Sequence, residues 1–248
     1  MWIKKHSVTL DISKCKGCTN CIKRCPTEAI RVRDGHAIIK EEKCIDCGEC
    51  IRVCPYQAKK AIFDALEDFE SYKYKIALPA PALYGQFEDL DDVDEVLTAL
   101  LACGFDSVFE VSRAAEIVTE YTRRYLKREG LTKPVISSAC PAVLRLIRER
   151  FPNLLENIMP LISPMEAAAR QAREEAIKKT GLKDEEIGVF FITPCPAKVT
   201  SIKAPLTVEK SSVSGAIAVK DAFAKIYPLI DGIKDEKPLA ISGSEGIF

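Results

Sequence analysis

Eight of the eleven cysteines lie within the first 54 residues and form a duplicated motif. Each copy reads C-x2-C-x2-C-x3-C-P, and the second copy follows the first at an offset of 29 residues. The same offset aligns Lys14 with Lys43 and Ala29 with Ala58. Thiolates this closely spaced are ligands for soft transition metals. The cysteines are Cys15, Cys18, Cys21 and Cys25 in the first copy, and Cys44, Cys47, Cys50 and Cys54 in the second.

The spacing predicts two cubane [4Fe–4S] clusters that exchange their fourth ligands. Three cysteines separated by two residues can each bind one corner of a cubane, while the intervening backbone donates amide hydrogens to its sulfurs. The fourth cysteine precedes a proline that turns the chain away, and it therefore points to the other cluster. The expected ligand sets are Cys15, Cys18, Cys21 and Cys54 for one cluster, and Cys44, Cys47, Cys50 and Cys25 for the other.

Structural zinc and disulfides are the alternatives for these cysteines. Zinc sites usually close with two CxxC or Cys/His pairs rather than with quartets that end in Cys-Pro. The number of cysteines is odd, and disulfide scaffolds belong to secreted proteins, whose leader is not recognisable here. The paired clusters are therefore favoured, and this segment resembles the bacterial two-cluster ferredoxins.

The overall composition argues against several classes of protein. The 248 residues carry 36 basic and 36 acidic side chains, so no overall charge favours nucleic acid or an anionic membrane. No apolar run approaches the roughly 18 residues of a membrane span. Residues Met1–His6 lack the apolar segment of a secretory signal. We expect a cytoplasmic protein that binds neither nucleic acid nor membrane.

The rest of the chain has the pattern of an α/β protein. Residues 61–74 are expected to form an amphipathic connecting helix, with Ile62, Leu66 and Phe69 on one side. Apolar runs then alternate with helical periodicities, which predicts a mostly parallel sheet covered by helices on both faces. The apolar runs are Ile76–Ala80, Val108–Val111, Val135–Ser138, Val189–Thr193 and Leu239–Ile241, and the helical patterns cover residues 90–101, 114–125, 144–151 and 168–176.

These patterns predict a fold of α/β and α+β class in three parts. Residues 1–60 form a small ferredoxin-like domain, residues 61–74 a helical connector, and residues 75–248 a larger α/β domain. Ligands of such sheets usually lie at the carboxyl ends of the strands.

Three cysteines lie outside the duplicated motif. Cys140 and Cys195 each follow an apolar run and precede a proline, which suits the first position of a helix. A thiol at a helix N-terminus is favoured as thiolate, so it can act as a metal ligand or nucleophile. A small buried hydrophobe and a redox disulfide between the two are the alternatives. Cys103 follows the apolar face of a helix and is expected in the core.

Around these cysteines the chain resembles the N-terminal part of the [FeFe]-hydrogenase-like proteins, and the resemblance covers essentially all of it. The family's motif T-S-C-C-P is matched by Ser137–Pro141, and its motif M-P-C-x-x-K-x-x-E by Thr193–Ser201. The resemblance implies that Cys140 and Cys195 are two of the four ligands to the cubane of the H-cluster. It implies that Lys198 hydrogen-bonds a cyanide of the diiron subsite. Without the resemblance, Lys198 is equally well interpreted as a solvated lysine at a helix start. In the first motif, Ser138 is assigned to the cofactor site.

Four positions depart from the family's pattern. Ala139 replaces the cysteine expected to donate protons, and Ser201 replaces the glutamate of the proton path. Thr193 replaces a methionine beside the diiron unit, and Met165 stands where glutamine is usual. Loss of a proton-transfer group slows turnover by orders of magnitude. The substitutions therefore resemble those of the family's sensory branch, and no catalytic residue is assigned.

The family's third motif, E-x-M-A-C-x-x-G-C, has no match, since no cysteine follows Cys195. We therefore expect the α/β domain to be incomplete at its C-terminus, and any H-cluster-type site to be partial or completed by a partner. The leading hypothesis is an electron-transfer protein with two [4Fe–4S] clusters and a redox partner. The alternatives are a redox- or H2-sensing module that acts through a partner, and a hydrogenase if a missing segment is supplied.

Overall fold

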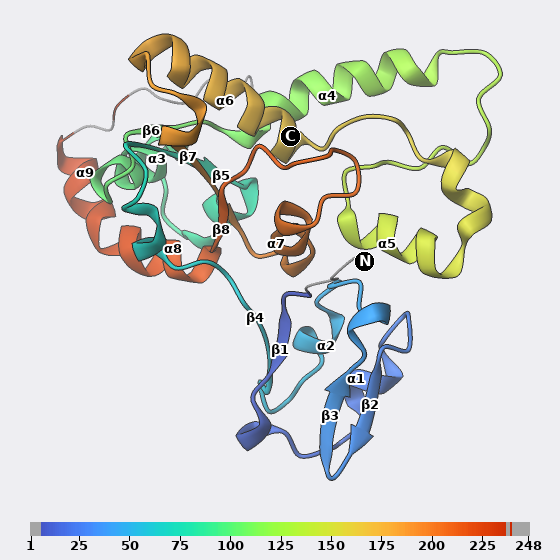
Figure 1. Cartoon of the computed structure of the whole chain (residues 1–248). Helices are drawn as coiled ribbons and strands as arrows, with labels where there is room; N and C mark the ends of the chain where they lie inside the picture. Colours follow the sequence, from blue (N-terminus) through green and yellow to red (C-terminus); the bar gives the residue numbers. More distant parts are fainter. Residues whose placement is uncertain (1–5, 237–238, 240–248) are drawn as a thin grey trace. The chain divides into compact units, whose positions relative to one another are not determined.

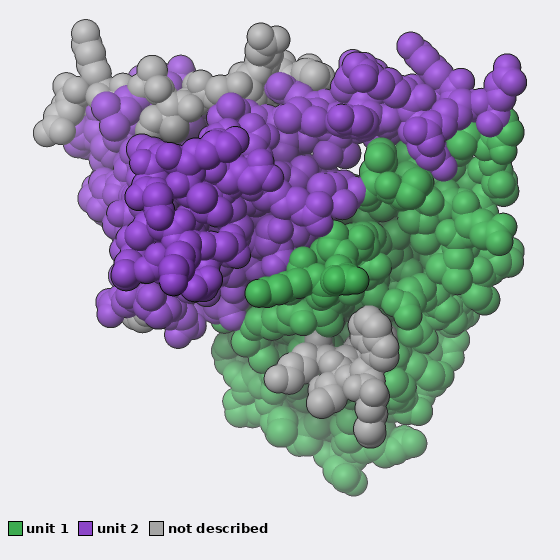
Figure 2. Space-filling model, turned by 45° about the horizontal axis from the view of Figure 1, so that its top comes forward, with its two compact units in different colours: residues 1–63, 130–161, 195–210 green, residues 64–129, 162–194, 211–248 purple. Residues whose placement is uncertain are grey.

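The computed structural model describes residues 6–236 and residue 239, and its chain divides into two compact units (Figure 2). Unit 1 comprises residues 1–63, 130–161 and 195–210, and unit 2 comprises residues 64–129, 162–194 and 211–248. Two later segments therefore join the N-terminal residues in unit 1. The linear division into 1–60, 61–74 and 75–248 stays a prediction about domains.

The N-terminal part of unit 1 repeats one backbone conformation twice, as the duplicated sequence predicts. Two antiparallel strand pairs and two short helices carry the cysteine loops (Figure 1). The elements are β1 (Val8–Leu10) paired with β4 (Lys59–Ala61), β2 (Ile30–Arg33) paired with β3 (His36–Ile39), α1 (Asn20–Lys23) and α2 (Glu49–Arg52). Positive φ angles recur in pairs 29 residues apart, at Gly17 and Asp46, Thr19 and Gly48, and Glu28 and Gln57.

The later segments of unit 1 contribute two helices that begin at Cys-Pro sequences. Helix α5 spans Pro141–Arg150 and helix α7 spans Pro196–Lys203. The strand expected at Val135–Ser138 is wrong, because this segment forms only an isolated parallel bridge between Ile136 and Ile158. The N–H of Ile136 donates to the carbonyl of residue 157, so its pairing partner is a neighbouring loop rather than the main sheet.

Unit 2 contains a four-stranded parallel sheet with the order β6-β5-β7-β8, which confirms the expected mixed α/β class with a mostly parallel sheet. The central strand β7 is buried along its whole length, because it has a strand on each side and helices on its faces. The strands are β5 (Tyr74–Pro79), β6 (Ser107–Val108), β7 (Ile187–Thr193) and β8 (Gly215–Ala218).

Two groups of helices pack in unit 2. Helices α4 and α6 lie side by side, and α6 contacts β5 and β7 (Figure 1). Helices α3, α8 and α9 form the second group, and α8 contacts β7 and β8. Long amphipathic patterns in the sequence correctly located most of these helices. They are α3 (Val93–Ala102), α4 (Val111–Leu126), α6 (Pro164–Thr180), α8 (Val219–Ile226) and α9 (Ile230–Glu236).

The connecting helix expected at residues 61–74 is wrong. The only helical element among these residues is a short 3-10 turn at Leu66–Phe69, between the end of β4 and the start of β5. Asp64 instead pairs with Ala216 of the edge strand β8, donating its N–H to the Ala216 carbonyl at 2.9 Å and accepting the Ala216 N–H on Oδ2 at 2.8 Å. Aspartate side chains that bind backbone amides compete with helix formation, which explains the difference.

The expectation that Cys103 lies in the core is also wrong, because its side chain is exposed. Cys103 is the residue at which α3 ends, and its N–H donates to the carbonyls of Ala99 and Leu100. The next residue, Gly104, has a φ of 96°, which turns the chain away from the helix axis. The buried face of α3 therefore ends one turn earlier.

The strand expected at Leu239–Ile241 falls largely outside the described residues, and Leu239 itself has no regular structure. Within the part of the chain that is described, no helix combines the length and the apolar character that a membrane crossing requires.

Phe190 on β7 occupies the centre of the unit 2 core. Its ring centroid lies 3.7 Å from that of Phe69 and 5.6 Å from that of Tyr72. Gly188 makes room for this packing, since a Cβ there would lie 2.6 Å from the Phe190 ring.

We predict that Phe190→Ala lowers the free energy of unfolding by about 3–5 kcal/mol, because it removes a buried ring and leaves a cavity. The control is Tyr121→Ala on α4, whose side chain is 57% exposed, with an expected change within about 0.5 kcal/mol. Urea unfolding followed by circular dichroism measures both. Equal midpoints for the two variants would contradict this description of the core.

Candidate metal centre

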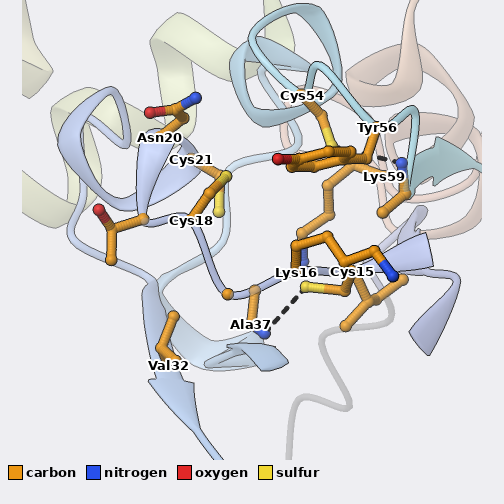
Figure 3. A pocket seen from close by; sticks show the side chains of 14 residues that line it. Cys15, Lys16, Cys18, Asn20, Cys21, Val32, Ala37, Cys54, Tyr56 and Lys59 are labelled. Atoms are coloured by element: carbon orange, nitrogen blue, oxygen red, sulfur yellow. Dashed lines mark hydrogen bonds between the residues drawn. The ribbon is translucent and has the colours of Figure 1, made fainter. Parts of the chain in front are cut away.

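Four cysteines from both copies of the motif line one cavity of unit 1. The cavity holds about 360 Å³ of space open to solvent, and its cysteines are Cys15, Cys18, Cys21 and Cys54. Cys18 and Cys21 lie on one side of it, whereas Cys54, Tyr56 and Lys59 enter from the other (Figure 3). We call this space the first cavity.

The remaining four motif cysteines line a second cavity of about 350 Å³. They are Cys25, Cys44, Cys47 and Cys50. The structure therefore brings the fourth cysteine of each copy to the three cysteines of the other, as the spacing predicts. That these thiols bind metal stays a prediction, which the hydrogen bonds and charges around the sulfurs support.

Backbone amides point at several of the cysteine sulfurs. The N–H of Ala29 donates to Cys25 Sγ at 3.2 Å, and the N–H of Ala58 donates to Cys54 Sγ at 3.3 Å. These two bonds are equivalent in the duplication. Although burial opposes it, the amides around Cys54 and the nearby Lys59 ammonium lower the pKa of Cys54. The loop thus favours a negatively charged sulfur even without a bound metal.

Four other thiols of the two cavities are in a different electrostatic environment. Burial raises the pKa of Cys44 and of Cys50 to about 12. Burial also raises the pKa of Cys21 and Cys47. Thiolates in such positions are unfavourable unless a positive centre replaces the proton, and iron bound in the cavity is such a centre.

Lys59 provides an independent test of what the first cavity can hold. Its side chain is buried with 3% exposure, and its Nζ has no hydrogen-bond partner among the described residues. A buried ammonium without an anionic partner is strongly unfavourable. The residues therefore fit a [4Fe–4S] group, which carries about two negative charges with its four thiolates.

Asp46, between Cys44 and Cys47, is the centre of a buried polar network that sequence reasoning missed. Its carboxylate accepts hydrogen bonds from the N–H of Ser7 at 3.0 Å and from Thr200 Oγ1 at 2.8 Å. Arg145 Nη1 lies 3.3 Å from Asp46 Oδ2. Arg145 is on α5 and Thr200 is on α7, so one carboxylate joins a cysteine loop to both later helices.

A second group of possible metal donors contains His6, Cys44 and Asp46, whose ligand atoms lie within 4.8 Å of one another. It belongs to the second cavity rather than to a separate site, since Cys44 lines that cavity and Asp46 is engaged by Arg145.

Cys140 and Cys195 occupy equivalent positions in unit 1, as the residues immediately before α5 and α7. Their backbone angles are nearly the same, with φ −101° and ψ 108° for Cys140 and φ −96° and ψ 112° for Cys195. The Cys140 side chain is exposed and that of Cys195 is half-buried. Lys198 Nζ donates to the Ala139 carbonyl at 2.9 Å, so it connects the two Cys-Pro loops.

Ser138 is buried, and its hydroxyl donates to the Leu161 carbonyl. This bond holds the loop that precedes Cys140. The cofactor-binding roles of Ser138 and Lys198, and the ligand roles of Cys140 and Cys195, stay predictions. Two thiols do not complete the four-cysteine ligation of a cubane, so we derive no chemistry through an H-cluster.

Comparison with known proteins assigns the family. The family described as "Iron only hydrogenase large subunit, C-terminal domain" matches residues 73–224, and the "4Fe-4S dicluster domain" matches residues 7–56. This chain belongs to the iron-only hydrogenase large-subunit family. It is an iron–sulfur protein with a hydrogenase-like domain.

Two curated relatives of this hydrogenase-family chain are only distantly similar. Iron hydrogenase 1 of Clostridium pasteurianum is 26% identical over 285 residues, covering 99% of this chain and 49% of the relative. NADP-reducing hydrogenase subunit HndD of Solidesulfovibrio fructosivorans is 26% identical over 200 residues, covering 74% of this chain and 30% of the relative. The chain thus spans about half or less of their lengths.

A solved [FeFe]-hydrogenase structure, concerned with oxygen inactivation through the H cluster 2Fe subcluster, has a similar fold. Its TM-score is 0.50 at 17% sequence identity, and the match covers 73% of this chain and 48% of that chain. At this identity the similarity concerns the fold alone.

The duplication contained a signal for the residues that sequence reasoning missed. The 29-residue offset pairs Asp46 with Gly17 and Lys59 with Ile30. At both pairs the two copies differ in charge, although their backbones are alike. These differences make Asp46 and Lys59 candidates for positions where the two copies have different surroundings.

We predict that Cys54→Ser and Cys25→Ser each remove one cluster and leave the other. Each variant then retains about half of the iron and acid-labile sulfide of the wild type. Cys103→Ser, at an exposed thiol in unit 2, serves as the control and should retain all of it. Loss of both clusters in both variants would contradict two independently ligated cavities.

We predict that Arg145→Met destabilises the protein by about 3–5 kcal/mol, because it leaves the Asp46 carboxylate buried without its cation. The double variant Asp46→Asn, Arg145→Met recovers much of this loss, and the exposed Arg148→Met changes little. Denaturant unfolding of the anaerobic protein measures all three. A double variant less stable than Arg145→Met would contradict the pairing.

Proposed function

We propose that this chain is an electron-transfer protein that holds two [4Fe–4S] clusters in the cavities of unit 1. The observation that carries the proposal is the exchange of Cys25 and Cys54 between the two cavities. Zinc sites formed by adjacent CxxC pairs do not need such an exchange. Clusters bound at these cysteines supply one-electron transfer.

The residues around the cysteines have separate tasks in this proposal. Amides of Ala29 and Ala58 donate to Cys25 and Cys54, which stabilises charge on the ligand sulfurs. Apolar side chains limit the access of water to the cavities and lower the local dielectric constant. They are Leu10, Val32 and Ala37 at the first cavity, and Val8, Ile30, Ile39 and Ile45 at the second.

The hydrogenase-like half supports a second role, as a redox- or H2-responsive module that is completed by a partner or a further segment. The supporting observation is that Lys198 links the loops of Cys140 and Cys195, while Asp46 ties the second cavity to α5 and α7. Ala139 has no proton to donate at the position where the family has a relay cysteine. For either role we propose a soluble redox partner in the cytoplasm. Neither role involves binding to nucleic acid or to a membrane.

The proposed function is tested by iron and sulfide quantitation with EPR on anaerobically purified, reconstituted protein. Two interacting [4Fe–4S] signals after reduction, and the same signals in Cys140→Ser, support an electron carrier with two clusters. CO and CN infrared bands, or an additional cubane lost in Cys140→Ser, would favour the hydrogenase-like role. Protein that binds zinc but no iron would contradict both.

A further inference from the structure

The two cluster cavities differ in charge at a position that is buried in both copies of the duplication. Lys59 lines the first cavity, and Ile30, its counterpart 29 residues earlier, lines the second. Both side chains are 3% exposed. The same wall of the two cavities therefore carries an ammonium in one case and an aliphatic chain in the other.

The fold directs Lys59, rather than its neighbour, into the protein. Lys59 and Lys60 are adjacent on β4, where successive side chains point to opposite faces. Lys60 is exposed, whereas Lys59 is buried opposite Leu10 of β1. Over the described part of the chain, Lys59 Nζ has no hydrogen-bond acceptor. Its positive charge favours the thiolate form of Cys54 and Cys21 in the first cavity, and also that of Cys50 in the second.

The charges at the second cavity are paired. Asp46 is bonded to Arg145, and Glu49 is bonded to Arg52. At the first cavity, Gly17 stands in place of Asp46, and the other lining cation, Lys16, is exposed to water and screened. Among the described residues, Lys59 is thus a buried cation at the first cavity whose Nζ has no hydrogen-bond acceptor.

We propose that Lys59 gives the cluster at Cys15, Cys18, Cys21 and Cys54 a higher reduction potential than the cluster in the second cavity. The inference rests on the two-cluster function proposed above. Reduction adds one electron from an external one-electron donor and no proton, so the charge of the cluster with its thiolates becomes more negative by one. A buried cation stabilises the more negative state.

The consequence is a direction for electron transfer. The second cavity belongs to the loop that Asp46 ties to α5 and α7, the helices that follow Cys140 and Cys195. An electron that arrives at the second cavity moves to the first, where Lys59 stabilises it. The first cavity is then the place from which a redox partner takes electrons.

The experiment is a potentiometric titration followed by EPR on the full chain with its clusters. Lys59→Met lowers the reduction equilibrium constant of one cluster at least tenfold, which is about 59 mV for one electron. The reduction potential of the other cluster changes by less. Lys59→Arg keeps the charge and stays near the wild type. The matched control is Lys60→Met, which removes the same charge from an exposed neighbour and changes neither potential.

A second measurement does not depend on how Lys59→Met folds. Cys25→Ser retains only the first cluster and Cys54→Ser only the second, so the cluster in Cys25→Ser should have the higher potential. Equal potentials in these two variants, or an unchanged potential in iron-replete Lys59→Met, would overturn the role of Lys59. A wild-type protein without iron–sulfur clusters would instead overturn the proposed function itself.

Discussion

The partial burial of the cysteine sulfurs is the constraint on which the cysteine loops of unit 1 depend. Burial raises the pKa of Cys44 and Cys50 to about 12, so the metal-free pocket favours neutral thiols. An amide points at Cys25 in the second cavity, and in the first cavity an amide points at Cys54 and the ammonium of Lys59 is buried. Burial alone disfavours both the thiolates and the ammonium. An anionic cluster bound to the thiolates would stabilise the ammonium, and its iron would stabilise the thiolates.

A second constraint links the cysteine loops to the rest of unit 1. The Asp46 carboxylate lies between two cysteines of the motif and binds Arg145 of α5 and Thr200 of α7. Ser7 adds a bond from its hydroxyl to the Pro196 carbonyl. Since a buried charge that loses its partner is strongly destabilising, this network fixes the loop of the second cavity against the helices that begin at the two Cys-Pro sequences.

Local patterns were sufficient to predict which cysteines lie together around each cavity, the helices with long amphipathic faces and the parallel sheet. Two expectations that depended on tertiary partners were wrong, since Asp64 pairs with Ala216 rather than starting a helix and Ile136 pairs with a nearby loop. The core placement of Cys103 was wrong for a local reason, because the chain turns at Gly104.

The sequence alone could have marked Lys59 and Asp46 only as two of several candidates, because Lys16 and Arg24 also have uncharged counterparts in the other copy of the duplication. The burial and the partners of Lys59 and Asp46 could not be predicted from the sequence. Arg145 and Thr200 are about 100 and 154 residues away from Asp46 along the chain. Distant pairing of this kind leaves no periodic pattern in a single sequence.

Anomalous X-ray diffraction at the iron edge, on crystals of the anaerobically purified chain, would locate the metal in unit 1. We predict two compact iron sites, one bounded by Cys15, Cys18, Cys21 and Cys54 and the other by Cys25, Cys44, Cys47 and Cys50. Iron sites bounded by the four cysteines of a single motif copy, or sites that scatter as zinc, would contradict this prediction.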